Sequence, residues 1–393
     1  MISRRTGKRT RLAIVTSHPI QYYAPLFKRL AARSNLDLHV FYGWNGALET
    51  DRGFAREVAW DVPLLDGYEH TFVPNESRDP GTHHRGGIAS SRLVPTVEQW
   101  APDAIMVHGW AFHSHLAAMR AFHGRVPVLF RGDSTLLGES RGPRRWLRRT
   151  WLRHVYRQVD VALYAGVQNR RYFEAHGVRG ERLEWAPPSV DNDRFHDPHG
   201  TLARDAAEWR TALAIPPDAT TILFAGKLDA TKSPELLLDA FMRGNPAQRE
   251  HLIFVGSGPL EQSLRAAAAD RPNVHFAGFQ NQRRMPVAYR LGDVFVLPSQ
   301  SETWGLAVNE AMASGRAVVA SDRVGCAADL VREGETGFVF PSGDAAALRA
   351  ALDRACTPDA RATLGARGEA LIREWSIDAT ASRIEGTVDR VTT

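Results

Sequence analysis

The sequence predicts two α/β domains, each built around a doubly wound parallel sheet. The chain has 393 residues, which is enough for two domains of ordinary size. Short apolar runs alternate with helical patterns in both halves, as they do in βαβ units. Between the halves lies APPSVDNDRFHDPHG, a segment rich in Pro and Asp that is typical of an interdomain linker.

The strands are predicted from short apolar runs. In the first half they lie at residues 12–16, 38–42, 70–73, 104–107, 126–130, 161–164 and 183–186, and a second series begins at Thr221. The linker predicts an N-terminal domain of residues 1–190 and a C-terminal domain of residues 191–374. The last stretch, residues 375–393, has helical character.

Composition excludes several classes of protein. Hydrophobic residues make up 44% of the chain and charged residues 24%, as in an ordinary globular protein. No apolar run reaches the roughly 18 residues of a membrane span, and the basic N-terminus lacks the apolar stretch of a signal peptide. A net charge of +5 is modest, and no nucleic-acid-binding module is found. With only two cysteines, no disulfide framework or cysteine metal site is expected, and a cytoplasmic protein is predicted.

Two glutamates, Glu302 and Glu310, lie eight positions apart. Residues 294–297 form an apolar run typical of a strand, and a helical period runs from Leu306 to Gly315. Glu302 therefore lies in the loop at the carboxyl end of a strand, where open α/β sheets bind ligands. Glu310 lies more than one turn inside the helix and can reach another part of the same ligand. Two solvated glutamates are the alternative interpretation.

The first turn of that helix supplies a second kind of ligand group. The amides around Trp304, Gly305 and Leu306 are open, because the first turn of a helix has no partners for them, and such an end binds anions. Carboxylates bind hydroxyl groups and the helix end binds phosphate, so carboxylates on either side of such a helix end suit a nucleotide sugar.

Two of the four lysines of the chain, Lys227 and Lys232, fall in one short segment. The predicted strand of residues 222–225 ends at Gly226, and Ser233 is predicted to N-cap a helix whose first residue is Pro234. Both ammonium groups thus lie on a strand-to-helix loop, where they can bind a diphosphate. The alternative is two exposed surface lysines.

From about residue 220 onward the chain resembles the retaining nucleotide-sugar glycosyltransferases of the GT-B fold, the family called glycosyltransferases group 1. The first half resembles this family only in layout. The motifs that carry the resemblance are, in order, Gly226-Lys227 with Lys232, the Gly256-x-Gly258 turn, NVHFAGF, the E-x7-E element from Glu302 to Glu310, SDRVGCAADLV and ETGFVFPSGD.

The resemblance implies a GT-B architecture, in which two Rossmann-like domains face a central cleft and the C-terminal helix packs back on the first domain. The N-terminal domain would bind the acceptor and the C-terminal domain a nucleotide diphospho-sugar. Lys227, Lys232 and the helix amides would stabilise the leaving diphosphate, so no metal and no other cofactor is expected. Glu302 would hold the transferred sugar and Glu310 the ribose. The further donor-binding residues would be Gly226, Gly256, Gly278, Phe279, Gln280, Thr303, Trp304, Gly305 and Leu306.

The acceptor side is expected in the N-terminal half. A first candidate is the loop after the first strand, with Ser17, His18, Gln21 and Tyr22, where many relatives carry a glycine-rich loop that this chain lacks. The alternative for this loop is a purely structural turn.

Two further candidates follow later strands. His108 directly follows the predicted strand of residues 104–107 and is similar to a strand-end histidine that contacts the donor sugar in the family; a structural hydrogen bond is the alternative. Arg131 stands where relatives often have histidine, and Asp133 either binds an acceptor hydroxyl or pairs with Arg131.

Residues 141–157 form a predicted basic helix with seven arginines, Trp146 and Trp151. Such a helix can associate peripherally with an anionic membrane, which would suit a lipid-linked acceptor at the inner face of the cytoplasmic membrane. A solvated face over a packed one is the alternative.

The predicted function is metal-independent transfer of a sugar to an acceptor hydroxyl with retention, in bacterial surface polysaccharide or glycoconjugate assembly. The acceptor would be a carbohydrate or a lipid-linked molecule. Three alternatives remain: a GT-B nucleotide-sugar epimerase, a phosphorylase, or a non-catalytic subunit that binds nucleotide sugar.

Overall fold

A computed structural model describes residues 9–45, 50–51, 56–57, 60–139, 142–245 and 249–393. The chain divides into two compact units. Unit 1 comprises Met1–Leu48, Pro63–Pro188 and Ile377–Thr393, and unit 2 comprises Glu49–Val62 and Ser189–Ser376.

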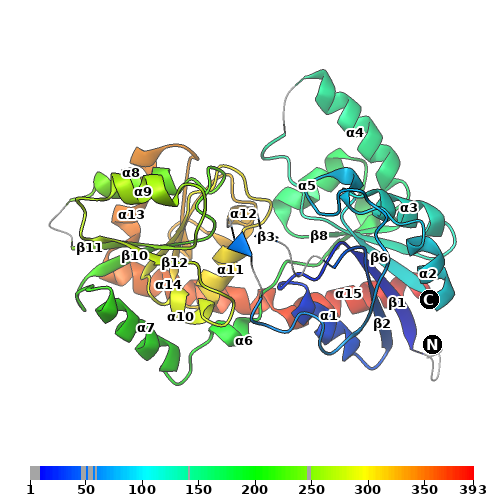
Figure 1. Ribbon diagram of the computed structural model, residues 1–393, viewed down its shortest axis with the longest axis horizontal. Coiled ribbons are helices and arrows are strands. Elements are labelled where there is room, and N and C mark those ends of the chain that lie inside the picture. The colour runs from blue at the N-terminus through cyan, green and yellow to red at the C-terminus, as the bar shows by residue number, and fades with distance from the viewer. Residues whose placement is uncertain (1–8, 46–49, 52–55, 58–59, 140–141, 246–248) are drawn as a thin grey trace. The chain divides into compact units, whose positions relative to one another are not determined.

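Unit 1 contains a parallel sheet of seven strands in the order β5-β2-β1-β6-β7-β8-β9 (Figure 1). Each of the seven runs predicted from the first half overlaps one of these strands. Their bounds are β1 Thr10–Thr16, β2 Leu36–Tyr42, β5 Glu69–Phe72, β6 Ala104–His108, β7 Val128–Arg131, β8 Val161–Tyr164 and β9 Leu183–Trp185. The central strand β6 is buried over its whole length, as expected for a strand covered on both faces.

The helices of unit 1 cover both faces of this sheet. They are α1 Ala24–Ala31, α2 Leu93–Trp100, α3 His113–Phe122, α4 Pro143–Tyr156, α5 Val167–Ala175 and α15 Ile377–Thr392, with short 3₁₀ turns η2 Arg85–Gly87 and η3 Gly180–Arg182. Alternate residues of β1 enter different cores: Leu12 and Ile14 pack with α1 and α15, whereas Ala13 and Val15 pack with α2 and α3.

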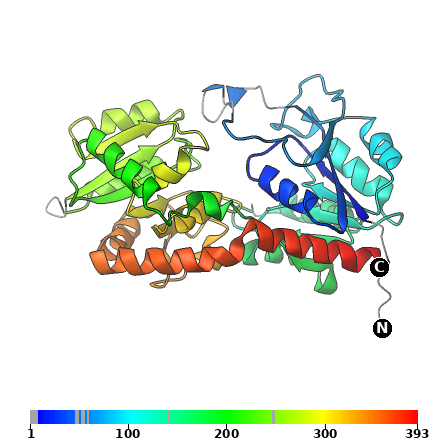
Figure 2. The ribbon, with the colours of Figure 1, turned by 90° about the horizontal axis from the view of Figure 1, so that it is seen from below.

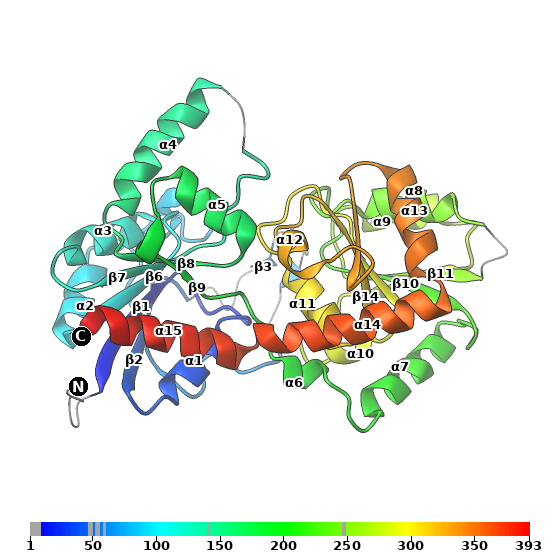
Figure 3. The same ribbon diagram turned by 180° about the vertical axis from the view of Figure 1, so that it is seen from behind.

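The C-terminal helix α15 packs beside α1 in unit 1, as Figures 2 and 3 show. Arg29 on α1 forms an ion pair with Asp378 at the start of α15. The side-chain amide of Asn35 donates to the Asp389 carboxylate at 3.1 Å. The last helix is therefore part of the unit formed by the first strands of the chain.

Unit 2 contains a parallel sheet of six strands in the order β12-β11-β10-β13-β14-β15. The strands are β10 Thr220–Ala225, β11 Glu250–Val255, β12 Val274–Gly278, β13 Val294–Leu297, β14 Ala317–Ser321 and β15 Gly337–Phe340. A separate antiparallel pair joins β3 Thr50–Asp51 to β4 Arg56–Glu57. The helices of unit 2 are α6 Asn192–Phe195, α7 Thr201–Ala212, α8 Pro234–Met242, α9 Glu261–Ala267, α10 Met285–Tyr289, α11 Leu306–Ala313, α12 Ala327–Leu330, α13 Ala345–Ala355 and α14 Pro358–Ile372, followed by the 3₁₀ turn η5 Arg373–Trp375.

Both sheets reverse their strand order at the first strand of the unit. In unit 2 the strand order runs outward from β10 in one direction through β11 and in the other through β13. Open α/β sheets bind ligands outside the carboxyl ends of the strands at such a switch point. A ligand site is therefore expected at the loops after β10 and β13 in unit 2. In unit 1 the corresponding loops are those after β1 and β6.

No helix among the described residues is long and apolar enough to cross a bilayer.

Candidate active site

The loop after β10 carries both lysines of the predicted phosphate site. The Lys232 amide donates to the Asp229 carbonyl and to its carboxylate, each at 3.1 Å, and this closes the turn in front of α8. Pro234 begins α8 as expected, but the side chain of Ser233 does not cap it. Ser233 has a φ of +52°, and its hydroxyl donates to the Ala230 carbonyl at 3.3 Å instead.

The loop after β13 brings Glu302 to the same place. The Gln300 amide donates to the Thr231 carbonyl at 2.8 Å, which ties this loop to the loop after β10. The Glu302 carboxylate forms an ion pair with the Lys232 ammonium group. About a fifth of each side chain is open to solvent, with exposed fractions of 18% for Glu302 and 24% for Lys232. Two residues that are 70 positions apart in the sequence thus form one charged pair at the switch point.

Main-chain bonds from the segment after β14 fix the position of Glu302. The Glu302 amide donates to the Arg323 carbonyl, and the Gly325 amide donates to the Glu302 carbonyl, both at 3.1 Å. A side chain at Gly325 would place its Cβ 1.9 Å from the Thr303 carbonyl oxygen, so only glycine permits this approach. The motif SDRVGCAADLV therefore acts through its backbone, a role that sequence reasoning did not assign to it.

The first turn of α11 begins at Gly305, which has a φ of +100°. A Cβ at Gly305 would lie 2.9 Å from Val324, so the sharp entry into the helix again requires glycine. The Trp304 indole is buried, donates to Asn309 Oδ1 at 2.9 Å and stacks on Trp375. Trp304 can therefore offer a ligand its main chain only.

Glu310 lies on the fifth residue of α11 and is 3% exposed. The Tyr289 hydroxyl, which comes from α10, donates to the Glu310 carboxylate at 2.7 Å. Burial makes an ionised carboxylate costly unless hydrogen bonds compensate for lost water. Tyr289 supplies such a bond, and no motif in the sequence had pointed to it.

Glycines end three neighbouring strands at this edge of the sheet: Gly226 follows β10, Gly256 follows β11 and Gly278 closes β12. The Gly226 amide donates to the Val255 carbonyl and the Gly256 amide to the Gly278 carbonyl, both at 2.9 Å. A Cβ at Gly256 would lie 1.9 Å from the Gly226 carbonyl oxygen. We call these three residues the glycine floor, because the sheet edge beside the lysines is formed by main chain.

The second glycine of the Gly-x-Gly turn supports the lysine loop. A Cβ at Gly258 would lie 2.5 Å from the Leu228 carbonyl oxygen, and the Leu228 amide donates to the Ser257 carbonyl at 3.0 Å. Leu228 directly follows Lys227, so the turn holds the main chain next to that lysine. Beyond the floor, the Gln280 side-chain amide donates to the Ala277 carbonyl at 2.7 Å, within its own loop.

In unit 1, His108 ends β6 and is 8% exposed. Neither of its ring nitrogens has a hydrogen-bond partner among the described residues. Tyr23 packs edge-on against the ring, with centroids 4.8 Å apart. Burial lowers the pKa of His108 well below its usual value, and the positive charge of Arg131 lowers it further. A neutral imidazole with two unused nitrogens is suited to a polar ligand.

Arg131 ends β7 and its guanidinium is buried. It donates to the Ala186 carbonyl at 3.0 Å and to the Pro187 carbonyl at 3.2 Å. Burial lowers the pKa of Arg131, while the negative charge of Asp133 opposes that shift. These bonds tie β7 to the segment that follows β9.

The loop after β1 places its polar residues at the carboxyl edge of the unit 1 sheet. Ser17 Oγ lies 2.9 Å from His18 Nδ1, and the His18 ring lies edge-on to Trp44. Burial lowers the pKa of His18. Gln21 and Tyr22 are half-buried in the turn before α1.

Two family models match this chain. Residues 5–194 match the model described as Glycosyltransferase Family 4, and residues 205–369 match the one described as Glycosyl transferases group 1. Between them the two matches span most of the chain. The chain belongs to the glycosyltransferases of group 1 and family 4.

Named glycosyltransferases are similar to parts of the chain. The D-inositol 3-phosphate glycosyltransferase of Thermomonospora curvata is 32% identical over 229 residues, which is 55% of this chain and 53% of the relative. The sulfoquinovosyl transferase SQD2 of Arabidopsis thaliana is 30% identical over 273 residues, which is 65% of this chain and 50% of the relative. The chain therefore spans about half the length of the curated relatives it matches.

The solved structure of Anabaena Alr3699/HepE in complex with UDP-glucose matches this chain with a TM-score of 0.71. The match covers 97% of this chain and 100% of the other at 18% identity, so it shows a shared fold. The predicted GT-B fold class is confirmed, and so is the resemblance to the group 1 glycosyltransferases.

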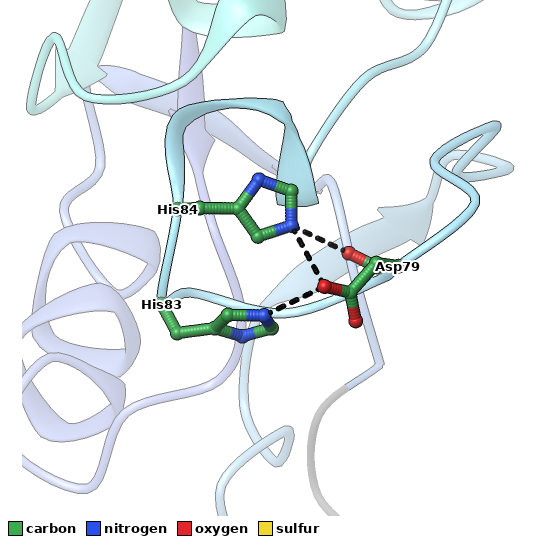
Figure 4. Close-up of side chains that lie close together, drawn as sticks. All are labelled: Asp79, His83 and His84. Carbon is green, nitrogen blue, oxygen red and sulfur yellow. Dashed lines mark hydrogen bonds and ion pairs between the residues drawn. The ribbon is translucent and has the colours of Figure 1, made fainter.

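One group of potential metal ligands is found among the described residues: Asp79, His83 and His84 (Figure 4). His83 Nε2 lies 3.0 Å from Asp79 Oδ2, and His84 Nε2 lies 2.9 Å from the Asp79 carbonyl oxygen. The Gly86 amide donates to His84 Nδ1 at 3.1 Å, so the neutral ring carries its proton on Nε2, the atom that faces Asp79. A metal ion would require loss of that proton, and all three side chains are exposed. We therefore assign the group to closure of the turn before η2.

Proposed function

We propose that the chain transfers a sugar from a nucleotide diphospho-sugar to an acceptor hydroxyl with retention of anomeric configuration. The observation that supports this most is the pairing of Lys232 with Glu302 beside the glycine floor and the start of α11. A cation for phosphate, a carboxylate for sugar hydroxyls and an open helix end then lie at one switch point within unit 2.

The chemical task is to stabilise negative charge on the departing diphosphate. Lys227, Lys232 and the first-turn amides of α11 would supply preorganised donors for it. The bond from the anomeric carbon to the phosphate oxygen breaks, and the acceptor oxygen bonds to the same face of the sugar. The acceptor proton passes to the departing phosphate, so no protein nucleophile or metal ion is needed.

The two glutamates would bind different parts of the donor. Glu302 would hold hydroxyls of the transferred sugar, because its carboxylate lies beside Lys232. Glu310 would hold the ribose, with its carboxylate oriented by Tyr289. Thr303, Gly305 and Leu306 would contact the phosphates, and Gly278, Phe279 and Gln280 would lie near the base.

On the acceptor side, His108 would contact the donor sugar or the acceptor, since both ring nitrogens are unused among the described residues. Ser17, His18, Gln21, Tyr22, Arg131 and Asp133 are proposed acceptor-side residues. The acceptor would be a carbohydrate or a lipid-linked molecule in bacterial surface polysaccharide or glycoconjugate assembly, at the cytoplasmic face of the membrane. This assignment rests on the common use of the family.

The first experiment is thermal unfolding of the protein with UDP, GDP, ADP and dTDP, each with and without attached sugars. UDP-glucose heads the panel because HepE has been solved with it. A ligand at a hundred times its Kd adds about 2.7 kcal/mol to the free energy of unfolding, which is readily seen as a melting shift. The Lys227→Ala/Lys232→Ala variant is the control, and it should lose the shift without losing its fold.

Each outcome has a separate meaning. One base that stabilises the wild type but not the variant supports the proposed donor site and names the donor class. No shift with any nucleotide contradicts it and favours a non-donor role. With the donor known, NMR of the product reports the anomeric configuration, and an inverted product would exclude retention. Free nucleotide released together with a glycosylated acceptor separates transfer from epimerisation, whereas a phosphorylase would require inorganic phosphate.

A further inference from the structure

The first half of α4 in unit 1 exposes large apolar side chains. Trp146 is 67% exposed and Leu147 is 61% exposed. Among the described residues only one other large hydrophobic side chain, Val167 at 40%, is comparably open. Trp and Leu side chains are normally buried in a folded protein. Two adjacent exposed ones therefore leave a large apolar area in contact with water.

The second half of α4 holds the helix in place. Leu152, Val155 and Tyr156 are buried in the core on one face of the unit 1 sheet. Trp151 packs edge-on against Trp110, with ring centroids 5.3 Å apart. Figures 1 and 3 show the N-terminal end of α4 extending away from the body of unit 1. The two tryptophans of the basic segment therefore differ: Trp151 is packed and Trp146 is not.

Helical periodicity puts Trp146 on the outer face of α4, whereas Leu147 lies one turn before Trp151, on the side of the helix that packs further along. Positions 146, 150, 153 and 157 share one side of the helix, and the buried positions 152, 155 and 156 share the other. Arg153 and Arg157 on that outer side are exposed, as are Arg144 and Arg145 in the first turn. The apolar pair thus lies within a basic surface.

That basic surface is not neutralised locally. The helix has no acidic residue. Arg149 pairs with Glu139 at 2.5 Å, and Arg148 lies over the Trp110 ring. For the other arginines of α4, no acidic partner is found among the described residues. The outer face of α4 therefore presents net positive charge to solvent.

We propose that α4 docks unit 1 onto the surface of an anionic lipid bilayer. Trp146 and Leu147 insert at the level of the headgroups, where amphipathic aromatic rings are favoured. The surrounding arginines bind lipid phosphates. A lipid surface supplies both the apolar region and the dense negative charge that this face lacks. This inference does not depend on the proposed sugar transfer, because α4 contains none of the residues assigned to the donor.

Sedimentation with lipid vesicles tests the docking. The full-length protein should sediment with vesicles of phosphatidylglycerol and phosphatidylcholine, but not with phosphatidylcholine alone, and salt should weaken the binding. The Trp146→Ser/Leu147→Ser variant should lose most of it. Each of Arg144→Glu and Arg145→Glu should weaken binding by about fivefold or more, since one basic residue near such a surface contributes about that factor.

Matched variants separate docking from general effects. Val167→Ser removes the third exposed large apolar side chain among the described residues of unit 1. Arg204→Glu and Arg271→Glu, made separately, each match the charge change of the α4 variants on unit 2. All three controls should sediment as the wild type does. The thermal shift with nucleotide should be unchanged in the α4 variants, and far-ultraviolet circular dichroism reports whether they fold. Because the thermal shift reads unit 2 alone, failure of docking and failure of the donor proposal are distinguishable.

Two results would overturn the proposal. One is equal sedimentation of the wild type and the Trp146→Ser/Leu147→Ser variant with anionic vesicles, or no sedimentation of either. The other is a wild-type protein that is dimeric by light scattering and does not bind vesicles, together with a Trp146→Ser/Leu147→Ser variant that is monomeric. That result would make α4 an interface between copies of the chain.

Discussion

The Lys232 ammonium group and the Glu302 carboxylate form an ion pair across the two loops that follow β10 and β13. Each is expected to bind a different part of the donor, the lysine a phosphate and the glutamate a sugar hydroxyl. Before the donor arrives, each neutralises the other in a partly enclosed site. On this proposal, donor binding would replace the protein ion pair by contacts to the ligand, so the effects of the two residues on donor use would be energetically coupled.

A double-mutant cycle measures this coupling. Lys232→Met and Glu302→Gln should each lower kcat/KM for the donor by about a hundredfold or more. Expressed as activation free energy, the loss in the double variant should be smaller than the sum of the two single losses, and the difference, the coupling energy, should be about 1 kcal/mol or more. Glu302→Gln should leave nucleotide affinity unchanged or higher, because Lys232 is released for phosphate. Lys28→Met is the control for loss of a lysine, and strictly additive effects would contradict the coupling.

Tyr289→Phe should weaken donor binding, although residue 289 is not expected to contact the donor. It removes the hydroxyl that donates to the Glu310 carboxylate at 2.7 Å. A hydrogen bond to a charged group contributes roughly 1.5–3 kcal/mol, so the nucleotide Kd should rise at least about tenfold while kcat changes little. Tyr42→Phe removes a buried hydroxyl that is bonded to Tyr68 in unit 1. That control should affect stability alone; equal nucleotide affinity in Tyr289→Phe would exclude the positioning role.

Gly256→Ala should disrupt the glycine floor. The new Cβ would meet the Gly226 carbonyl oxygen at 1.9 Å, and Gly256 has a φ of +138°. The free energy of unfolding in urea should fall by roughly 3 kcal/mol, and nucleotide binding should be lost with it. Gly386→Ala is the contrasting variant, because Gly386 lies within α15 with open space around its Cβ position. It should stabilise unit 1 by about 0.5–1 kcal/mol. Equal effects of the two would show that the close approach does not matter.

Stability should fall as pH drops below neutral, because buried histidines favour the neutral ring. Burial lowers the pKa of His115 to about 4 and that of His275 to about 4. The unfolded chain has a histidine pKa of about 6.5, so it binds more protons than the fold between these values. The stabilisation is complete above about pH 6.5 and is lost as pH falls toward about 4.

Chemical denaturation at several pH values measures this dependence. For the fully buried His115, about 2 kcal/mol should be lost by about pH 5. His115→Gln should flatten the curve by that amount. His83→Gln, which changes an exposed ring, should not. A slope that His115→Gln leaves intact would show that other groups cause it.

Chelation tests the expected independence from metal. Turnover should be unchanged by EDTA, because Lys227, Lys232 and the α11 amides are expected to carry the diphosphate charge. Loss of activity that Mg²⁺ or Mn²⁺ restores would contradict this expectation. Asp79→Asn serves as a second arm: if it abolished a chelator effect, the metal would act at the exposed Asp79 group in unit 1 and not at the diphosphate.

The sequence predicted the strands well because each is a short apolar run bounded by loop residues. The runs of residues 161–164 and 294–297 coincide with β8 and β13, and the others differ from the strands by one or two residues at their ends. Alternation along the chain also predicted that Glu302 and Lys232 both follow parallel strands. It could not predict that the two side chains touch, because that contact depends on β10 and β13 being neighbours in the sheet.

What the sequence missed depends on contacts between distant segments. Tyr289 lies 21 residues before Glu310 in another helix, and no spacing relates the two. The requirement for Gly325 arises only when its loop meets Thr303. Ser233 has the composition of an N-cap, but its backbone adopts a left-handed conformation that directs the hydroxyl elsewhere. The different surroundings of Trp146 and Trp151 follow from which face of α4 packs on the unit 1 core.

The main-chain bonds between the Glu302 loop and the segment after β14 have a practical consequence for protein engineering. The carboxylate is placed by backbone atoms, and the neighbouring side chains of Gln300, Thr303 and Arg323 are exposed. A combinatorial library that varies these three positions and keeps Gly305 and Gly325 should retain the scaffold in most members. Selection from such a library would test whether these positions set the sugar specificity of the proposed transfer.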